Sequence, residues 1–345
     1  MFVKPTGSRY GRFWFCFLLA ICPLSFVVQA ENSEHSGVSV GGLLFGDLYH
    51  VTSHHLPEGD GALGAVLRRG YLTLDGESAS NWFGRLRLEA NQSGEFETYD
   101  FEVDFKDAYL GYKTDRYEVI AGLQPTLTFD VIEREWGKRY LMRTPVDLQG
   151  VPSRDTGFSL RGQITDSLSY RAMVGVGQDF GAESGDGTAR MLALNWRVND
   201  QWAIDAYYDN ERRPGEADVE SRQIFASYRN GAFNAGAQYS YRDREAEATG
   251  ELASVFGVWQ RSSRSSLIGR IDRIIEPSIR GDNIAYIPFD PSAPATLYLG
   301  AYEYRLSDHL VVTPNTIVVS YDRNDEGLRP ETDVYFRLTF FFDWE

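Results

Sequence analysis

The chain has 345 residues, with 34 lysines and arginines against 49 aspartates and glutamates, so its formal net charge is −15. Such an acidic chain lacks the basic footprint that nucleic-acid binding requires, and we expect no nucleic-acid partner. Aromatic residues make up 14% of the chain, glycines number 33, and the mean hydropathy is −0.34. The chain as a whole is therefore not hydrophobic, and its length allows one large domain or two ordinary ones.

Residues 1–30 are predicted to form a cleavable signal peptide. Three basic residues precede the apolar run FWFCFLLAICPLSFVV, which is short for a transmembrane helix and is broken by Pro23. Small residues at the end of this segment predict cleavage after Ala30. Both cysteines, Cys16 and Cys22, belong to the segment, so the mature chain is expected to have neither a disulfide framework nor thiol chemistry.

Residues 31–345 are rich in segments where apolar and polar side chains alternate with a period of two. The last of them, VYFRLTFFFDW, has one entirely apolar face and one face that carries Arg337, Thr339 and Asp343. Alternation of this kind predicts strands with two unlike faces. Sixteen candidate strands begin near residues 39, 66, 82, 101, 116, 157, 167, 189, 201, 221, 232, 252, 265, 296, 309 and 333.

The connections between these strands alternate in length. Tight ones such as KTDR, VND and RNG are followed by longer polar ones such as ERRPGEADVES and DRNDEGLRPET. Outer-membrane barrels are threaded in this way, and a closed barrel pairs every backbone group within lipid. We therefore predict an all-β fold for residues 31–345: a transmembrane antiparallel β-barrel of about 16 strands in the bacterial outer membrane, in contact with lipid and lipopolysaccharide. A barrel of this size leaves room for a water-filled channel.

The third long connection, about residues 125–153, interrupts the strand pattern with the stretch VIEREWGKRYLMR. Loops of this length are usually functional, and we expect this one to fold into the lumen as a constriction. Its apolar side chains would pack on the inner wall: Val131, Ile132, Trp136, Tyr140 and Leu141. Its charged side chains would set pore size and charge: Arg134, Lys138, Arg139 and Arg143, opposed by Glu133 and Glu135. The alternative is an outer loop that only shields the rim.

Strand parity also directs several arginines into the lumen. The wall residues singled out are Arg85, Arg87, Arg161 and Arg171, and inward-facing acids such as Asp75, Glu89, Glu118 and Asp205 oppose them. Because rings of charge set ion selectivity, a mild preference for anions is one hypothesis. The alternative is that these arginines pair with neighbouring acids and only stiffen the wall.

Four segments in a fixed order carry a resemblance to a known family. FKDAYLGYK, AGLQP, RDTGFSLRG and LSYRAMVGVG, all between residues 100 and 180, resemble the phosphate-selective porin family, porins O and P. The resemblance implies a homotrimeric porin of sixteen strands whose third loop narrows the pore, and a phosphate-like permeant. Phosphate specificity in that family uses converging lysines and arginines, whereas only three lysines follow the signal peptide here.

Signals of catalysis or of a cofactor are weak. The stretch HVTSHH, residues 50–55, is interpreted as an exposed loop. His50 and His54 have the His-x3-His spacing that can bind a metal ion when both lie on one helix, but this segment is not helical in pattern. His50 and Ser53 lack a third group to orient them as a hydrolase pair. We predict no enzyme and no cofactor, but a passive porin for small hydrophilic solutes, with anionic ones preferred. The alternatives are a barrel enzyme of lipase or protease type and a closed structural or receptor barrel.

Overall fold

The computed structural model describes residues 36–92, 101–177, 187–212, 217–244, 249–278, 281, 284 and 286–344. The predicted signal peptide lies outside these ranges. None of the helices within them is long and apolar enough to cross a membrane.

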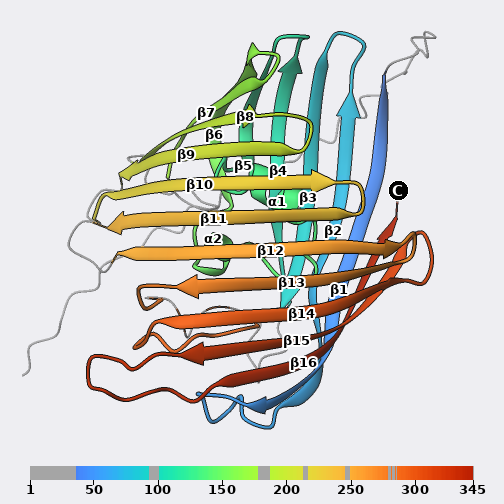
Figure 1. Cartoon of the computed structure of the whole chain (residues 1–345). Helices are drawn as coiled ribbons and strands as arrows, with labels where there is room; N and C mark the ends of the chain where they lie inside the picture. Colours follow the sequence, from blue (N-terminus) through green and yellow to red (C-terminus); the bar gives the residue numbers. More distant parts are fainter. Residues whose placement is uncertain are drawn as a thin grey trace, which may run out of the picture. The chain divides into compact units, whose positions relative to one another are not determined.

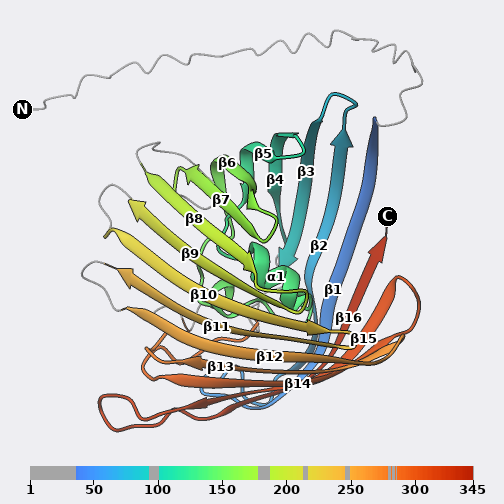
Figure 2. The ribbon, with the colours of Figure 1, turned by 45° about the horizontal axis from the view of Figure 1, so that its top comes forward.

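The described residues form sixteen strands that close into one barrel (Figures 1 and 2). Each strand pairs antiparallel with its neighbours in chain order, and β1 pairs with β16 to complete the ring. The strands are β1 (Gly37–Ser53), β2 (Leu63–Glu77), β3 (Trp82–Gln92), β4 (Phe101–Lys113), β5 (Tyr117–Pro125), β6 (Arg154–Thr165), β7 (Leu168–Gly175), β8 (Thr188–Arg197), β9 (Trp202–Arg212), β10 (Val219–Asn230), β11 (Phe233–Arg244), β12 (Gly250–Ser262), β13 (Ser265–Ile274), β14 (Ala295–Arg305), β15 (Leu310–Tyr321) and β16 (Asp333–Trp344). The predicted barrel of about sixteen antiparallel strands is confirmed.

The two faces of the strands differ as the alternation predicts. On β16, Phe336 and Leu338 lie on the outer surface with 48% and 41% of their area exposed, whereas Arg337 between them is 7% exposed and points inside. On β12, Trp259 is exposed outside, while Ser254 is buried inside and donates to Asp272 at 2.6 Å. An apolar exterior around a polar interior suits a barrel surrounded by lipid.

Two β-bulges break the alternation and turn extra charges inward. In the β1–β2 ladder, Phe45 pairs with Arg69 but Gly46 pairs with Leu67, so Arg68 is the extra residue. In the β3–β4 ladder the extra residue is Lys106. A bulge lets two consecutive side chains point to the same face. Arg68 and Lys106 are accordingly both 5% exposed, inside the barrel.

The inner wall is not polar throughout, which corrects the expectation of a polar inner face on every strand. Leu297 and Leu299 of β14 and Ile317 and Val319 of β15 are buried on the inner side, in one cluster with apolar residues of the third long loop. The loop replaces water against this part of the wall, so apolar side chains are favoured there on both faces of the sheet.

Candidate functional site

The third long loop lies inside the barrel, where Figure 2 shows its first helix enclosed by strands. It contains α1 (Asp130–Trp136) and α2 (Pro145–Leu148). Gly137 ends α1 in the left-handed conformation with φ 61°, and its N–H bonds to the carbonyl of Glu133. Pro145 begins α2, a position where its missing N–H costs no hydrogen bond.

Apolar side chains hold this loop on the wall, and the predicted set is confirmed. Val131, Ile132, Trp136, Tyr140 and Leu141 are each no more than 7% exposed. The Trp136 ring packs edge-on against Phe256 of β12 with 5.1 Å between centroids, and its Nε1–H donates to the carbonyl of Met142 at 2.8 Å. The loop is therefore docked by a core of its own within the lumen.

Two of the predicted charged residues reinforce this docking. Glu135 lies 3.0 Å from Arg229 of β10, and its carbonyl accepts a hydrogen bond from Asn234 of β11. Lys138 pairs with Glu303 of β14 at 2.5 Å. Glu135 and Lys138 therefore hold the loop against β10, β11 and β14.

The remaining predicted loop charges lie elsewhere. Arg134 is largely exposed, with 61% of its side chain accessible. Arg139 contacts both Glu133 and Asp147, the latter in α2. Burial of Asp147 opposes its ionisation, but the charges of Arg139, Arg143 and Arg69 outweigh burial and hold the pKa of Asp147 below its usual range. Arg139, Arg143 and Asp147 therefore form the charged face that the loop turns towards β2.

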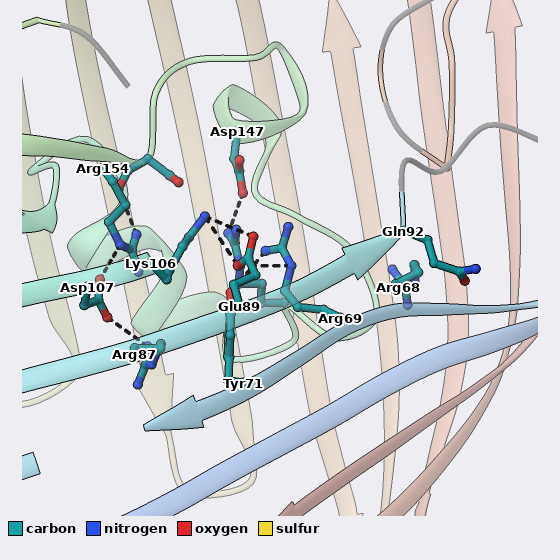
Figure 3. A network of polar contacts seen from close by, with 12 residues as sticks. Arg68, Arg69, Tyr71, Arg87, Glu89, Gln92, Lys106, Asp107, Asp147 and Arg154 are labelled. Atoms are coloured by element: carbon teal, nitrogen blue, oxygen red, sulfur yellow. Dashed lines mark hydrogen bonds and ion pairs between the residues drawn. The ribbon is translucent and has the colours of Figure 1, made fainter. Parts of the chain in front are cut away.

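Opposite this face, charged side chains of β2, β3 and β4 contact one another in a network around Glu89 and a second group around Asp107 (Figure 3). Glu89 of β3 lies 3.4 Å from Arg69 of β2 and 3.4 Å from Lys106 of β4. The single carboxylate of Glu89 therefore contacts two cations. The network is therefore richer in positive than in negative groups.

Further along the same wall, Asp107 of β4 is shared in the same way. It contacts Arg87 of β3 at 3.3 Å and Arg154 of β6 at 2.6 Å. Arg85 of β3 instead pairs with Asp75 of β2 at 2.6 Å, and both side chains are about a third exposed. Arg85 and Arg87 are thus each paired with an acid.

The other two predicted wall arginines meet the start of α1. Arg171 of β7 lies 3.1 Å from Asp130 and 2.5 Å from Asp205 of β9, while Arg161 of β6 lies 3.6 Å from Asp130 and 3.9 Å from Glu118. Asp130 is the first residue of α1, where a negative charge is favoured by the helix dipole. Arg161 and Arg171 thereby fix one end of the loop.

The loop and the wall meet at a narrow recess of about 20 Å³ next to β2. Four guanidinium groups line it, those of Arg68, Arg69, Arg139 and Arg143. The charged face of the loop, its partner Glu133 and the groups around Glu89 and Asp107 together contain six cations and four acids, a formal charge of +2. They are Arg69, Arg87, Lys106, Arg139, Arg143 and Arg154 against Glu89, Asp107, Glu133 and Asp147.

Sequence reasoning missed a second contributor, the segment between β13 and β14. Within it Ile287 and Phe289 are buried against the loop, and Tyr286 adopts a φ of 74°. The Tyr286 hydroxyl lies 2.9 Å from the carbonyl oxygen of Arg68 and 2.7 Å from that of Gln92, and its single proton can be donated to either. A positive φ is rare for a bulky side chain and is held here by these contacts. Residues of two inserted segments thus pack together inside the barrel.

The histidine-rich stretch also differs from its expected exposure. His50 lies on the outer face of β1, but His54 is only 2% exposed. The Ser53 hydroxyl lies 2.6 Å from the carbonyl oxygen of Thr332 and 3.1 Å from Glu331 Oε1, and its single proton is directed to these acceptors. His50 and Ser53 therefore form no hydrolase pair, and the interpretation of residues 50–55 as an exposed loop is wrong at His54.

A closed barrel of sixteen antiparallel strands, apolar outside and charged inside, is the architecture of bacterial outer-membrane barrels. Solved structures support this class at low sequence identity. OmpF of Salmonella typhi superposes with a TM-score of 0.64 at 14% identity, covering 89% of this chain and 98% of that one. An anion-selective porin from Comamonas acidovorans gives 0.63 at 12% identity, with 90% and 100% covered. OmpT, an outer-membrane protein of Vibrio cholerae, gives 0.63 at 14% identity, with 90% and 98% covered.

No protein-family model matches the chain. No curated protein matches it either. The structural likeness defines the fold, so the role of the constriction is argued from its own residues.

Proposed function

We propose that the chain is a passive, water-filled porin for small hydrophilic solutes and that its constriction favours anions. The observation that carries this proposal is the recess where four arginines converge between the third loop and β2. Guanidinium groups recognise carboxylates and phosphates through paired N–H donors. The formal charge of +2 in the surrounding set favours the same sign of solute, although the chain as a whole is acidic.

A phosphate-like oxyanion is the permeant that the charge of the arginine recess favours most, as the resemblance to phosphate-selective porins suggests. The charged groups proposed to line the path are Arg139, Arg143, Glu133 and Asp147 of the loop. Arg134, Glu135 and Lys138 are proposed to shape the constriction by fixing the loop, and Arg85, Arg87, Arg161 and Arg171 to carry the wall charge. One structural neighbour is described as an anion-selective porin, which supports the same direction.

The remaining parts of the proposal follow from this class. Residues 1–30 act as the signal peptide, and the mature barrel assembles as a homotrimer in a lipopolysaccharide-containing membrane. Turnover chemistry is not part of the proposal, because His50 and Ser53 point to different surroundings in the described structure.

Neutralising the loop arginines tests the anion preference. The double variant Arg139→Gln/Arg143→Gln is expected to move the reversal potential in a salt gradient towards cation selectivity, because Glu133 and Asp147 lose their counter-charge. A unit charge about 4 Å away in water is worth about 1 kcal/mol, so each removed charge changes the permeability ratio roughly fivefold. The measurement is the reversal potential of single channels in planar bilayers.

The matched control is Arg212→Gln/Arg222→Gln. Arg212 and Arg222 lie at the long-loop end with more than 60% of each side chain exposed. An equal shift in both double variants would contradict the role of the constriction. Folded wild-type protein that conducts no ions would contradict the porin and support the closed receptor barrel, for which the packed interior is the supporting observation.

A further inference from the structure

Two consecutive histidines lie buried where β1 ends, apart from the constriction. The side chain of His55 is 4% exposed and Asp333, the first residue of β16, is fully buried. The rings of His54 and His55 stack with 4.5 Å between centroids and 21° between planes. The porin proposal gives these residues no role.

Asp333 organises the second imidazole. Its Oδ1 accepts from the backbone N–H of His55 at 2.7 Å and contacts His55 Nδ1 at 2.9 Å, and its Oδ2 accepts from the Tyr321 hydroxyl at 2.5 Å. Without a metal ion the carboxylate accepts the Nδ1–H proton; an ion bound between Nδ1 and Oδ1 would take the place of that proton, and the ring proton would then lie on Nε2. The 2.9 Å between His55 Nδ1 and Asp333 Oδ1 is close to the separation of two ligand atoms on one zinc ion.

The first imidazole is also in the form that metals require. The N–H of Leu56 donates to His54 Nδ1 at 2.9 Å, and His54 Nε2 lies 2.9 Å from the Tyr335 hydroxyl. A ring nitrogen that accepts a hydrogen bond carries no proton, so the His54 ring is neutral in this arrangement. Neutral imidazole is the species that binds divalent transition metals.

The ligand atoms are close enough to converge on one ion. One ligand atom from each of His54, His55 and Asp333 lies within 4.8 Å of the other two. In zinc sites nitrogen and oxygen ligands lie about 2.0–2.2 Å from the ion, which sets them roughly 3.3 Å apart. The histidines belong to the loop after β1, so a small shift of that loop closes the difference. Coordination would replace one of the two hydrogen bonds of His54.

We propose that His54, His55 and Asp333 form a binding site for a divalent transition-metal ion of the zinc type at the long-loop end of the barrel. Two imidazoles and one carboxylate favour such ions over Mg²⁺ and Ca²⁺, which prefer oxygen ligands. Three protein ligands leave a fourth position for water. The hydroxyls of Tyr321 and Tyr335 lie beside the ligands as hydrogen-bond partners.

An ion at this site would tie the first long loop to β16. The Tyr321 hydroxyl that bonds to Asp333 also accepts from the backbone N–H of Asp290 at 3.2 Å. Asp290 belongs to the β13–β14 segment that contributes Tyr286 to the constriction. The site is therefore in hydrogen-bonded contact with a segment that shapes the channel.

The test uses the full mature barrel without a polyhistidine tag, folded in detergent and treated with a chelator that is then removed. Calorimetric titration with Zn²⁺ alone is expected to show one saturable site per chain, and titration with Mg²⁺ none. Wild-type protein that shows no saturable Zn²⁺ binding overturns the proposal without any variant.

The variants locate the site. His54→Ala/His55→Ala is expected to lose the saturable binding, and His50→Ala, on the outer face of β1, to retain it. Heat-modifiable migration in gels checks that each variant is folded. If the double variant does not fold, Asp333→Asn takes its place with the same expected loss. Zn²⁺ binding that survives in the folded variants, or that disappears equally in His50→Ala, overturns the proposal. Channel conductance is measured separately, so that a failure of the metal site can be told from a failure of the proposed porin function.

Discussion

Replacing Trp136 with alanine is expected to release the third loop from the inner wall and to raise the single-channel conductance, while the barrel stays closed. Trp136 is 2% exposed, packs on Phe256, and has the guanidinium of Arg270 over its ring at 5.2 Å. Truncation of a buried aromatic to alanine costs about 3–5 kcal/mol. That cost falls on loop docking, because Trp136 takes no part in the strand ladders.

Two measurements check this expectation: conductance in planar bilayers and limited proteolysis between residues 126 and 153. Trp259→Ala is the matched control, because Trp259 lies on the outer face of β12 with 51% of its area exposed. A Trp136→Ala channel with the conductance and protease resistance of the Trp259→Ala protein would show that the loop is held by other contacts.

The strands were predictable from the sequence because each strand has lipid on one side and the barrel interior on the other. Lipid selects apolar side chains outside and the interior selects polar ones, so period two is visible in a segment as short as VYFRLTFFFDW. The same logic predicted the buried face of the third loop, since Val131, Ile132 and Trp136 recur at helical spacing.

The bulges were not predicted, although the sequence contains a signal for them. Arg68 and Arg69 are adjacent, as are Lys106 and Asp107, so strict alternation would place one charge of each pair against lipid. Arginine or lysine at the bilayer midplane costs about 2–4 kcal/mol. In β2 and β4 the adjacent charges coincide with a bulge that turns both inward, whereas Asp272 and Arg273 of β13 are adjacent in a regular ladder.

The contribution of the β13–β14 segment could not be predicted from local pattern. Tyr286 bonds to Arg68, 218 residues earlier in the chain, and accepts a hydrogen bond from Arg337 through its carbonyl. Contacts over such separations depend on the closed barrel, not on local propensity. The apolar inner wall of β14 and β15 has the same origin, because its partner is a loop from the first half of the chain.

Asp47→Asn is expected to lower the free energy of unfolding by about 3–5 kcal/mol, the usual cost of removing one partner of a buried ion pair. Asp47 is 1% exposed, and its Oδ2 lies 2.8 Å from Arg68 Nε and 3.7 Å from Arg337. Thr339 donates to Oδ1 at 2.6 Å. Without the carboxylate, two guanidinium groups that are 5% and 7% exposed remain in the wall with no balancing charge there.

The same change is expected to loosen the constriction. Arg68 donates through one nitrogen to the carbonyl of Leu141 at 3.4 Å and through another to that of Tyr140, so it joins β2 to the third loop. Asp47 orients this guanidinium, and its loss allows Arg68 to leave the loop carbonyls. We therefore expect noisier open-channel current in Asp47→Asn, together with the loss of stability.

Denaturant titration followed by tryptophan fluorescence measures the stability change, with Asp75→Asn as the matched control. Asp75 pairs with Arg85 at 2.6 Å, but their side chains are 38% and 30% exposed, so water screens the pair and its loss is expected to cost about 0–1 kcal/mol. Adding Arg68→Met to Asp47→Asn is expected to recover part of the stability, because one uncompensated buried charge is removed. Equal losses in Asp47→Asn and Asp75→Asn would mean that water reaches Asp47 and that the charges behind the third loop are solvated.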